Sequence, residues 1–107
     1  MIFRYDNIKE IDLGGGVSRK ILAHNENLMA VEVSFEKNSV GALHKHEHEQ
    51  ISYVLKGSFK VTISGNDSIL KEGDTYYTAP DEEHGVLALE DGVLLDIFTP
   101  ERKDFLK

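Results

Sequence analysis

The stretch His44-Lys45-His46-Glu47-His48-Glu49-Gln50 determines how the rest of this 107-residue sequence is interpreted. Imidazole nitrogens are the commonest protein ligands for zinc, nickel, copper and iron. On a β-strand, the two-residue spacing of His44 and His46 places both rings on one face, where they can reach one ion. Gln50 can reach the same point if the chain turns at Glu47–Glu49. The stretch therefore predicts a metal site on β-structure, because histidine ligands on a helix more often lie four residues apart.

The other histidines divide into one further ligand candidate and two residues outside the site. His84 lies further along the sequence and is the third candidate ligand. His48 would point away from a site built by His44 and His46 if the alternation of the strand persists, so we predict that it lies on the surface. His24 is distant in sequence and is predicted to be structural or solvated. Neutral imidazoles and an amide leave the charge of a divalent ion uncompensated, so the site should attract an anionic substrate and act as a Lewis acid.

Hydrophobic patterning predicts an all-β chain. Short runs of β-branched and aromatic residues recur at close spacing and are separated by Gly, Asn and Asp, which is typical of a sandwich or barrel. Only the two ends of the chain are compatible with short helices, most clearly Pro100–Leu106. Closing the strands into a barrel would remove exposed edges and leave an interior cavity. The predicted strands are Leu28–Phe35, Ile51–Leu55, Ser58–Ile63, Thr75–Thr78, His84–Leu89 and Val93–Thr99.

Composition restricts the classes of protein to which the chain can belong. A length of 107 residues predicts one domain, residues 1–107, with a core large enough to fold without disulfides. Cysteine is absent, which rules out a thiol nucleophile or a Cys-ligated zinc site and suits the cytoplasm. The net charge of −7, with no basic stripe, disfavours nucleic-acid binding. No apolar run is long enough for a signal peptide or a membrane span, so we expect no membrane association.

A carboxylate in the middle of an apolar segment marks a second candidate site. The segment Val93–Thr99 reads VLLDIFT, and its alternation places Leu94, Asp96 and Phe98 on one face. A carboxylate on an apolar strand is uncommon without a specific role. If Asp96 points into the barrel, it is a buried carboxylate near the metal; otherwise this is an edge strand with Asp96 in water. Arg102 is either a C-terminal surface charge or a guanidinium that folds back over the cavity and binds a carboxylate.

Two spaced motifs resemble those of the cupins. His44-x-His46-x3-Gln50-x6-Gly57 resembles the first cupin motif, and Gly73-Asp74-x5-Pro80-x3-His84 resembles the second. The resemblance implies a single-domain cupin, that is, a double-stranded β-helix or jelly-roll barrel. Three positions depart from the family pattern: Asn38 and Glu82 stand where glycines are usual, and Ala88 stands where an asparagine is usual. These departures concern loop geometry more than metal ligation.

A closer resemblance, to the KdgF-type cupins or pectin degradation proteins, extends from end to end. It is carried by Arg19–His24, Leu28–Val33, the two motifs and Leu94–Arg102. It implies conversion of 4,5-unsaturated uronate monosaccharides, released by pectin or alginate lyases, into linear 4-deoxy-5-keto uronates. It further implies one divalent transition metal (zinc, nickel, iron or manganese), catalytic roles for Asp96 and Arg102, and substrate binding by Phe98 and Arg102. The implied metal ligands are His44, His46, Gln50 and His84.

Two alternative functions remain open at this point. Related cupin sites with three histidines also occur in non-haem iron dioxygenases, but that chemistry gives Asp96 and Arg102 no evident role. A non-catalytic sugar-binding or regulatory cupin module is the other alternative, because the cupin fold hosts many functions. Family resemblance also implies a homodimer, for which the apolar residues Phe3 and Tyr5 of the N-terminal segment are candidates.

Overall fold

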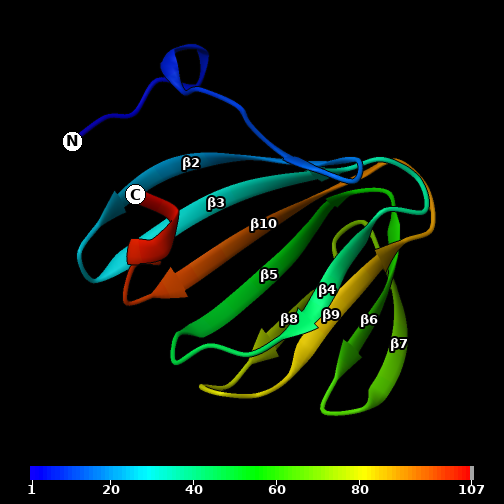
Figure 1. Cartoon of the computed structure of the whole chain (residues 1–107). Helices are drawn as coiled ribbons and strands as arrows, with labels where there is room; N and C mark the ends of the chain where they lie inside the picture. Colours follow the sequence, from blue (N-terminus) through cyan, green and yellow to red (C-terminus); the bar gives the residue numbers. More distant parts are fainter. Residues whose placement is uncertain (107) are drawn as a thin grey trace.

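Ten β-strands and two short 3-10 turns form the part of the chain that the computed structural model describes, residues 1–106 (Figure 1). No α-helix occurs in that range, so the all-β prediction is confirmed. The elements are η1 (Tyr5–Asn7), β1 (Ile11–Gly14), β2 (Val17–Asn25), β3 (Leu28–Phe35), β4 (Val40–His44), β5 (Glu49–Lys56), β6 (Ser58–Ile63), β7 (Asn66–Lys71), β8 (Thr75–Thr78), β9 (His84–Ala88), β10 (Gly92–Thr99) and η2 (Lys103–Leu106).

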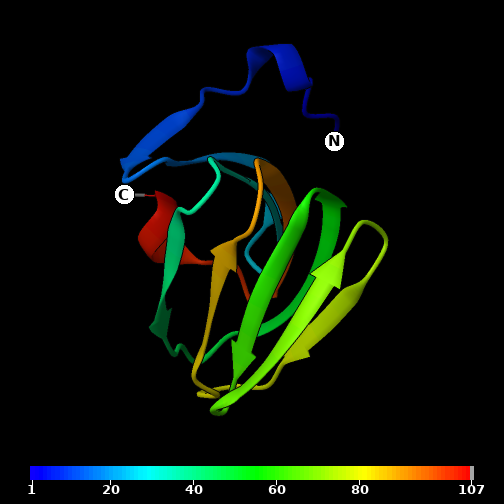
Figure 2. The ribbon, with the colours of Figure 1, turned by 90° about the vertical axis from the view of Figure 1, so that its right-hand side faces the viewer.

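The strands form two antiparallel sheets that face each other (Figure 2). The larger sheet has the order β1-β2-β3-β10-β5-β8, and the smaller has the order β4-β9-β6-β7. Each sheet therefore brings together strands that are far apart in sequence. β10 lies between β3 and β5 in the larger sheet, and β9 lies between β4 and β6 in the smaller one. Of the candidate metal ligands, His44 lies on β4, Gln50 on β5 and His84 on β9, whereas His46 lies on no strand.

Alternation along the strands sends apolar side chains between the sheets. On β3, Met29, Val31 and Phe35 are buried. The rings of Phe35 and Phe59 meet edge to face at 5.2 Å across the two sheets, a favoured aromatic geometry. A second cluster, Met29, Val31 and Phe98, is buried toward the other end of the larger sheet. Because Phe98 belongs to that cluster and also lines the cavity described below, the core supports the site directly.

The strand predictions from sequence agree closely with the structure where side chains alternate. Leu28–Phe35, Ser58–Ile63 and Thr75–Thr78 have the predicted bounds, and the other three predicted strands differ by one or two residues at an end. The strands without a prediction are those with weak alternation. β7 (Asn66–Lys71), for example, is polar and almost wholly exposed, and it exists because each residue pairs with β6. The remaining unpredicted strands are β1, β2 and β4.

The predicted C-terminal helix Pro100–Leu106 is a single 3-10 turn that begins at Lys103. It is closed by the backbone N–H of Phe105, which donates to the carbonyl of Arg102 at 3.0 Å. The turn returns the chain toward the inner face of the larger sheet, where the ring of Phe105 meets that of Phe98 with centroids 5.8 Å apart. In residues 1–106 there is no helix long and apolar enough to cross a membrane.

Two of the positions that depart from the cupin motifs, Asn38 and Glu82, lie in loops. Asn38 adopts a φ of 71°, a left-handed conformation that asparagine tolerates better than most residues. Glu82 accepts hydrogen bonds from the backbone N–H of Ala79 and the hydroxyl of Ser64, at 3.1 and 2.8 Å. The motif glycine Gly57 has a φ of 80°, and a Cβ there would lie 2.6 Å from a backbone oxygen. A side chain at Gly57 would therefore clash.

Candidate active site

Three histidines from three separate segments converge between the sheets. His44 ends β4, His84 begins β9, and the two are direct partners in the antiparallel register. Their ring centroids are 4.4 Å apart, and the centroids of His46 and His84 are 4.9 Å apart. One ring nitrogen from each histidine lies within 4.8 Å of the others. The three residues can therefore hold one ion.

His46 does not lie on a strand, contrary to the sequence-based reasoning. β4 ends at His44, and His46 lies in the loop that connects the smaller sheet to β5 of the larger one. Strand alternation therefore does not place its ring. The loop does so instead, because the Nδ1 of His46 donates to the carbonyl of His48 at 3.0 Å. The turn predicted at Glu47–Glu49 is present as a bend at Glu47 and His48, and β5 begins at Glu49.

Backbone carbonyls orient all three imidazoles. The Nδ1 atoms of His44 and His84 each lie 2.8 Å from a carbonyl oxygen, that of Ala42 and of Glu82 respectively. A carbonyl oxygen only accepts, so Nδ1 carries the proton in the neutral form of each ring, and in that form Nε2 presents a lone pair. Metal-ligating histidines typically use their second ring nitrogen in this way. The Nε2 of His84 is buried and has no hydrogen-bond partner in residues 1–106, which fits a ligand for a cation.

Gln50 places an oxygen acceptor beside the histidines. Its amide N–H donates to the hydroxyl of Ser52 at 2.8 Å, which turns its Oε1 toward the Nε2 of His46 at 3.1 Å. Burial, together with the nearby Arg102 guanidinium and the other two histidines, lowers the pKa of His46 to about 4. His46 is thus neutral at pH 7, and two lone pairs face each other. A divalent cation bound to both atoms would satisfy them, so these residues fit the metal that the donor set predicts.

Asp96 lies behind Gln50 and is linked to it through Ser52. The Ser52 hydroxyl donates to Oδ1 of Asp96 at 2.6 Å. Asp96 is thus the last member of a hydrogen-bonded chain that runs from His46 through Gln50 and Ser52. Burial raises the pKa of Asp96 to about 6, although hydrogen bonds from Ser52 and Gln50 and the charge of Arg102 oppose this rise. The structure therefore places Asp96 inside the barrel, and β10 is not an edge strand.

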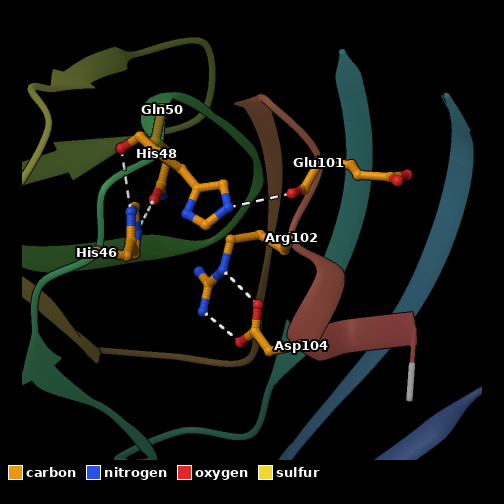
Figure 3. A network of polar contacts seen from close by, with 6 residues as sticks. All are labelled: His46, His48, Gln50, Glu101, Arg102 and Asp104. Carbon is orange, nitrogen blue, oxygen red and sulfur yellow. Dashed lines mark hydrogen bonds and ion pairs between the residues drawn. The ribbon is translucent and has the colours of Figure 1, made fainter. Parts of the chain in front are cut away.

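A cavity of about 240 Å³ connects these groups with the C-terminal segment. His44, Gln50 and His84 line it together with Asp96, Phe98 and Arg102. The Arg102 side chain is only 11% exposed, and its guanidinium lies 5.2 Å from the ring of Phe98. The Arg102 side chain extends from its backbone toward His46 (Figure 3). Its guanidinium donates two hydrogen bonds to the carboxylate of Asp104, at 2.9 and 3.1 Å. Of the two readings of Arg102, the structure adopts the guanidinium folded back over the cavity.

Comparison with known proteins identifies the family. Residues 31–98 match the cupin domain model. Over 97 residues the chain is 50% identical to pectin degradation protein KdgF of Dickeya dadantii (strain 3937), covering 89% of this chain and 88% of that protein. The chain belongs to the KdgF-type cupins.

Solved structures show that the similarity to this family is three-dimensional as well. KdgF from Halomonas sp. superposes with a TM-score of 0.93 at 39% identity, over 98% of this chain and 97% of that one. An RmlC-like cupin from Shewanella frigidimarina superposes with a TM-score of 0.94 at 38% identity, over 97% and 94% of the two chains. The predicted cupin fold is therefore confirmed for this KdgF-type chain.

One histidine of this KdgF-type cupin lies where the sequence did not predict it. His48 was predicted to lie on the surface but is 9% exposed. It follows the end of β4, so the alternation on which the prediction rested does not reach it. Its Nε2 donates to the backbone carbonyl of Glu101 at 3.1 Å, as Figure 3 shows. His48 thereby ties the histidine loop to the segment that carries Arg102. His24 is structural, since its Nδ1 lies 3.2 Å from the Glu101 carboxylate.

Sequence reasoning missed three polar residues that this KdgF-type cupin places at the cavity. Arg19 and Tyr76 line it, and Ser52 is fully buried between Gln50 and Asp96. A signal was present for Arg19, because it lies two residues from both Val17 and Ile21 on a strand and therefore shares their inward face. Ser52 shares the face of Gln50 by the same rule. Their importance depends on neighbours from other strands, which the sequence does not order.

Proposed function

We propose that this chain converts 4,5-unsaturated uronate monosaccharides into linear 4-deoxy-5-keto uronates, in the degradation of pectin or alginate. The observation that carries the proposal is one cavity that combines the histidine cluster with Asp96 and Arg102. A metal site, a buried carboxylate and a guanidinium together suit an anionic sugar whose protons must be moved. Similarity to pectin degradation protein KdgF supports the same substrate class.

We propose that one divalent transition metal is held by His44, His46, Gln50 and His84. Their donor atoms, three imidazole nitrogens and one amide oxygen, are compatible with zinc, nickel, iron(II) or manganese. When bound, such an ion supplies Lewis-acid stabilisation of negative charge that develops on substrate oxygens. The hydrogen bond from Gln50 to Ser52 keeps the amide oxygen turned toward the site, as outer partners of metal ligands commonly do.

Arg102 and Phe98 are proposed to position the sugar. A guanidinium suits the planar carboxylate of a uronate because it can donate two parallel hydrogen bonds. Phe98 lies beneath Arg102 and offers an apolar face to the sugar ring, which also keeps water away. Phe98 lies on β10, and Arg102 lies in the short segment between β10 and η2. These two elements therefore fix the placement of the two side chains relative to each other.

Asp96 is proposed to move the protons. In the cyclic substrate, the anomeric hydroxyl loses its proton, the bond between C1 and the ring oxygen breaks, and C1 becomes an aldehyde. The electron pair of the broken bond stays on the former ring oxygen. This oxygen becomes the C5 ketone as C4 accepts a proton, so the reaction is a balanced isomerisation. A carboxylate in the cavity can accept the first proton and return one to C4.

The test follows ultraviolet absorbance of the conjugated double bond. We expect metal-loaded wild-type protein to accelerate its loss well above the spontaneous rate with unsaturated uronate from pectin or alginate lysis. If neither substrate reacts faster, the enzyme proposal fails and a sugar-binding module takes its place. Oxygen uptake that depends on added iron would instead indicate the dioxygenase.

Replacing Arg102 with alanine is expected to raise KM for the unsaturated uronate about ten- to a hundredfold, with a smaller change in kcat. The reason is loss of a charge-assisted contact to the substrate carboxylate. Steady-state kinetics from the absorbance assay measure both constants. Lys103→Ala removes an exposed charge from the next position and serves as the control. An unchanged KM in Arg102→Ala would remove Arg102 from the substrate site.

We also propose a homodimer. The outer face of the larger sheet exposes Ile51 and Tyr53 of β5 and Tyr77 of β8. Ile51 and Tyr77 are direct cross-strand partners, and Tyr53 lies on the same face as Ile51. A contiguous apolar face of this kind suits a second copy of the chain. The N-terminal residue Tyr5, proposed from sequence, bonds to Glu32 of the same chain at 2.7 Å and so extends this face at β3.

Light scattering at micromolar concentration is expected to give twice the chain mass for the wild type and one chain mass for Tyr53→Glu. The charge would be buried without a partner in the proposed interface, which is strongly unfavourable. Ile69→Glu, at an exposed position of β7 in the smaller sheet, should remain dimeric. A monomeric wild type would contradict the proposal.

A further inference from the structure

A second arginine faces the cavity from β2 of the larger sheet. Arg19 lies on β2 between Val17 and Ile21, whose side chains pack against the two core clusters. Its side chain is half-buried and lines the same cavity as His84 and Asp96. The Nε of Arg19 is buried, and no group in residues 1–106 accepts its hydrogen bond. A buried guanidinium N–H without an acceptor is costly, which indicates a missing ligand.

Both arginines of the cavity contact the ring of Phe105. The Cζ of Arg19 lies 3.7 Å from the ring centroid, and that of Arg102 lies 4.3 Å from it. Both contacts are within the range of favourable cation–π stacking. Phe105 belongs to η2, so this turn holds both guanidinium groups beside one ring.

Only one of these two charges is matched by a carboxylate at hydrogen-bond distance. Arg102 is paired with Asp104 through two hydrogen bonds. The ion pairs in the described part of the chain are Arg102–Asp104 and His24–Glu101, and neither includes Arg19. Burial lowers the pKa of Arg19, and so does the charge of Arg102, while the charge of Asp104 raises it. The positive charge that lacks a direct partner in this cavity is therefore that of Arg19.

We propose that Arg19 is a second anion-binding residue of the cavity and that it donates hydrogen bonds, jointly with Arg102, to the carboxylate of the uronate. This inference rests on the proposed function for the identity of the anion. An incoming carboxylate supplies the acceptor that the buried N–H lacks. It also relieves the repulsion between the two guanidinium groups. The specificity of the site for acidic sugars over neutral ones then depends on a residue of β2 in addition to Arg102.

Equilibrium binding separates this role from a purely structural one. Isothermal titration calorimetry of metal-loaded protein compares galacturonate with its methyl ester, which has the same ring without the negative charge. We expect the wild type to bind the acid about ten- to a hundredfold more tightly than the ester, and Arg19→Gln to lose most of that ratio. If Arg19 served only to support Phe105, the substitution would weaken both ligands equally and leave the ratio unchanged.

Two further variants serve as controls and keep the test decisive. Lys20→Gln removes the next positive charge on β2, one that stacks on Tyr5 outside the cavity, and should keep the wild-type ratio. Arg19→Met provides a neutral side chain suited to apolar surroundings if the glutamine variant does not fold. A wild type without preference for the acid, or a neutral Arg19 variant with the full preference, would overturn the proposal. Suppose that the wild type prefers the acid and the Arg19 variant loses that preference, but the wild type does not turn over unsaturated uronate. This result would refute the proposed reaction and leave the role of Arg19 standing.

Discussion

Replacing His84 with alanine is expected to remove nearly all bound metal from the purified protein while the β-barrel still folds. The Nε2 of His84 is buried without a partner and faces the other two histidines, so its loss removes a ligand that no neighbour replaces. Removal of an outer partner of a metal ligand already weakens binding about 10–100-fold, and loss of a ligand itself should cost more. Elemental analysis of the purified variant measures the effect directly.

Other residues of the cluster provide graded comparisons. His44→Ala should lose metal as His84→Ala does, whereas Gln50→Ala should lose less, because an amide oxygen is a weaker, neutral ligand. His24→Ala is the matched control, since this histidine contacts Glu101 outside the cluster. Circular dichroism should show the strand content of the wild type in each variant. Full metal occupancy in both His44→Ala and His84→Ala would remove the histidine cluster from consideration as a metal site.

The second large effect is expected from Asp96→Asn, which should lower kcat about 10²–10⁴-fold with little change in KM. Asparagine keeps the shape of the side chain and can still accept the hydrogen bond from Ser52. It cannot exchange protons as a carboxylate does. The rate of alkene absorbance loss, corrected for the spontaneous reaction, measures the change.

The metal content of Asp96→Asn decides how that result is read. We expect it to equal that of the wild type, because Asp96 is not one of the proposed ligands and asparagine can keep the hydrogen bond with Ser52. Ser52→Ala is the matched comparison: it breaks the same hydrogen-bonded chain and leaves the carboxylate in place, so its kcat should fall much less. A fully active Asp96→Asn would transfer the proton-moving role to another group of the cavity.

Local sequence pattern predicted the strands of the core but not their neighbours. The alternation of Leu28–Phe35 and Ser58–Ile63 is strong because one face of each strand is buried, and period-two burial is visible in the residues themselves. β7 carries no such pattern and is a strand only because β6 pairs with it. The same reasoning failed at His46 and His48, since alternation ends where β4 ends.

By itself, the sequence determined the identity of the candidate chemical groups: the three histidines, Gln50, and a carboxylate on the inward face of an apolar strand. These followed from residue type and spacing, which are local properties. Only the tertiary structure decided which groups meet. β9 pairs with β4 to bring His84 to His44, and β10 pairs with β5, which sets Asp96 opposite Ser52. This packing also leaves the charge of Arg19 unmatched beside Phe105, while Arg102 pairs with Asp104. Burial and electrostatic neighbours arise largely from contacts between segments that are distant in sequence, so the sequence alone did not show them.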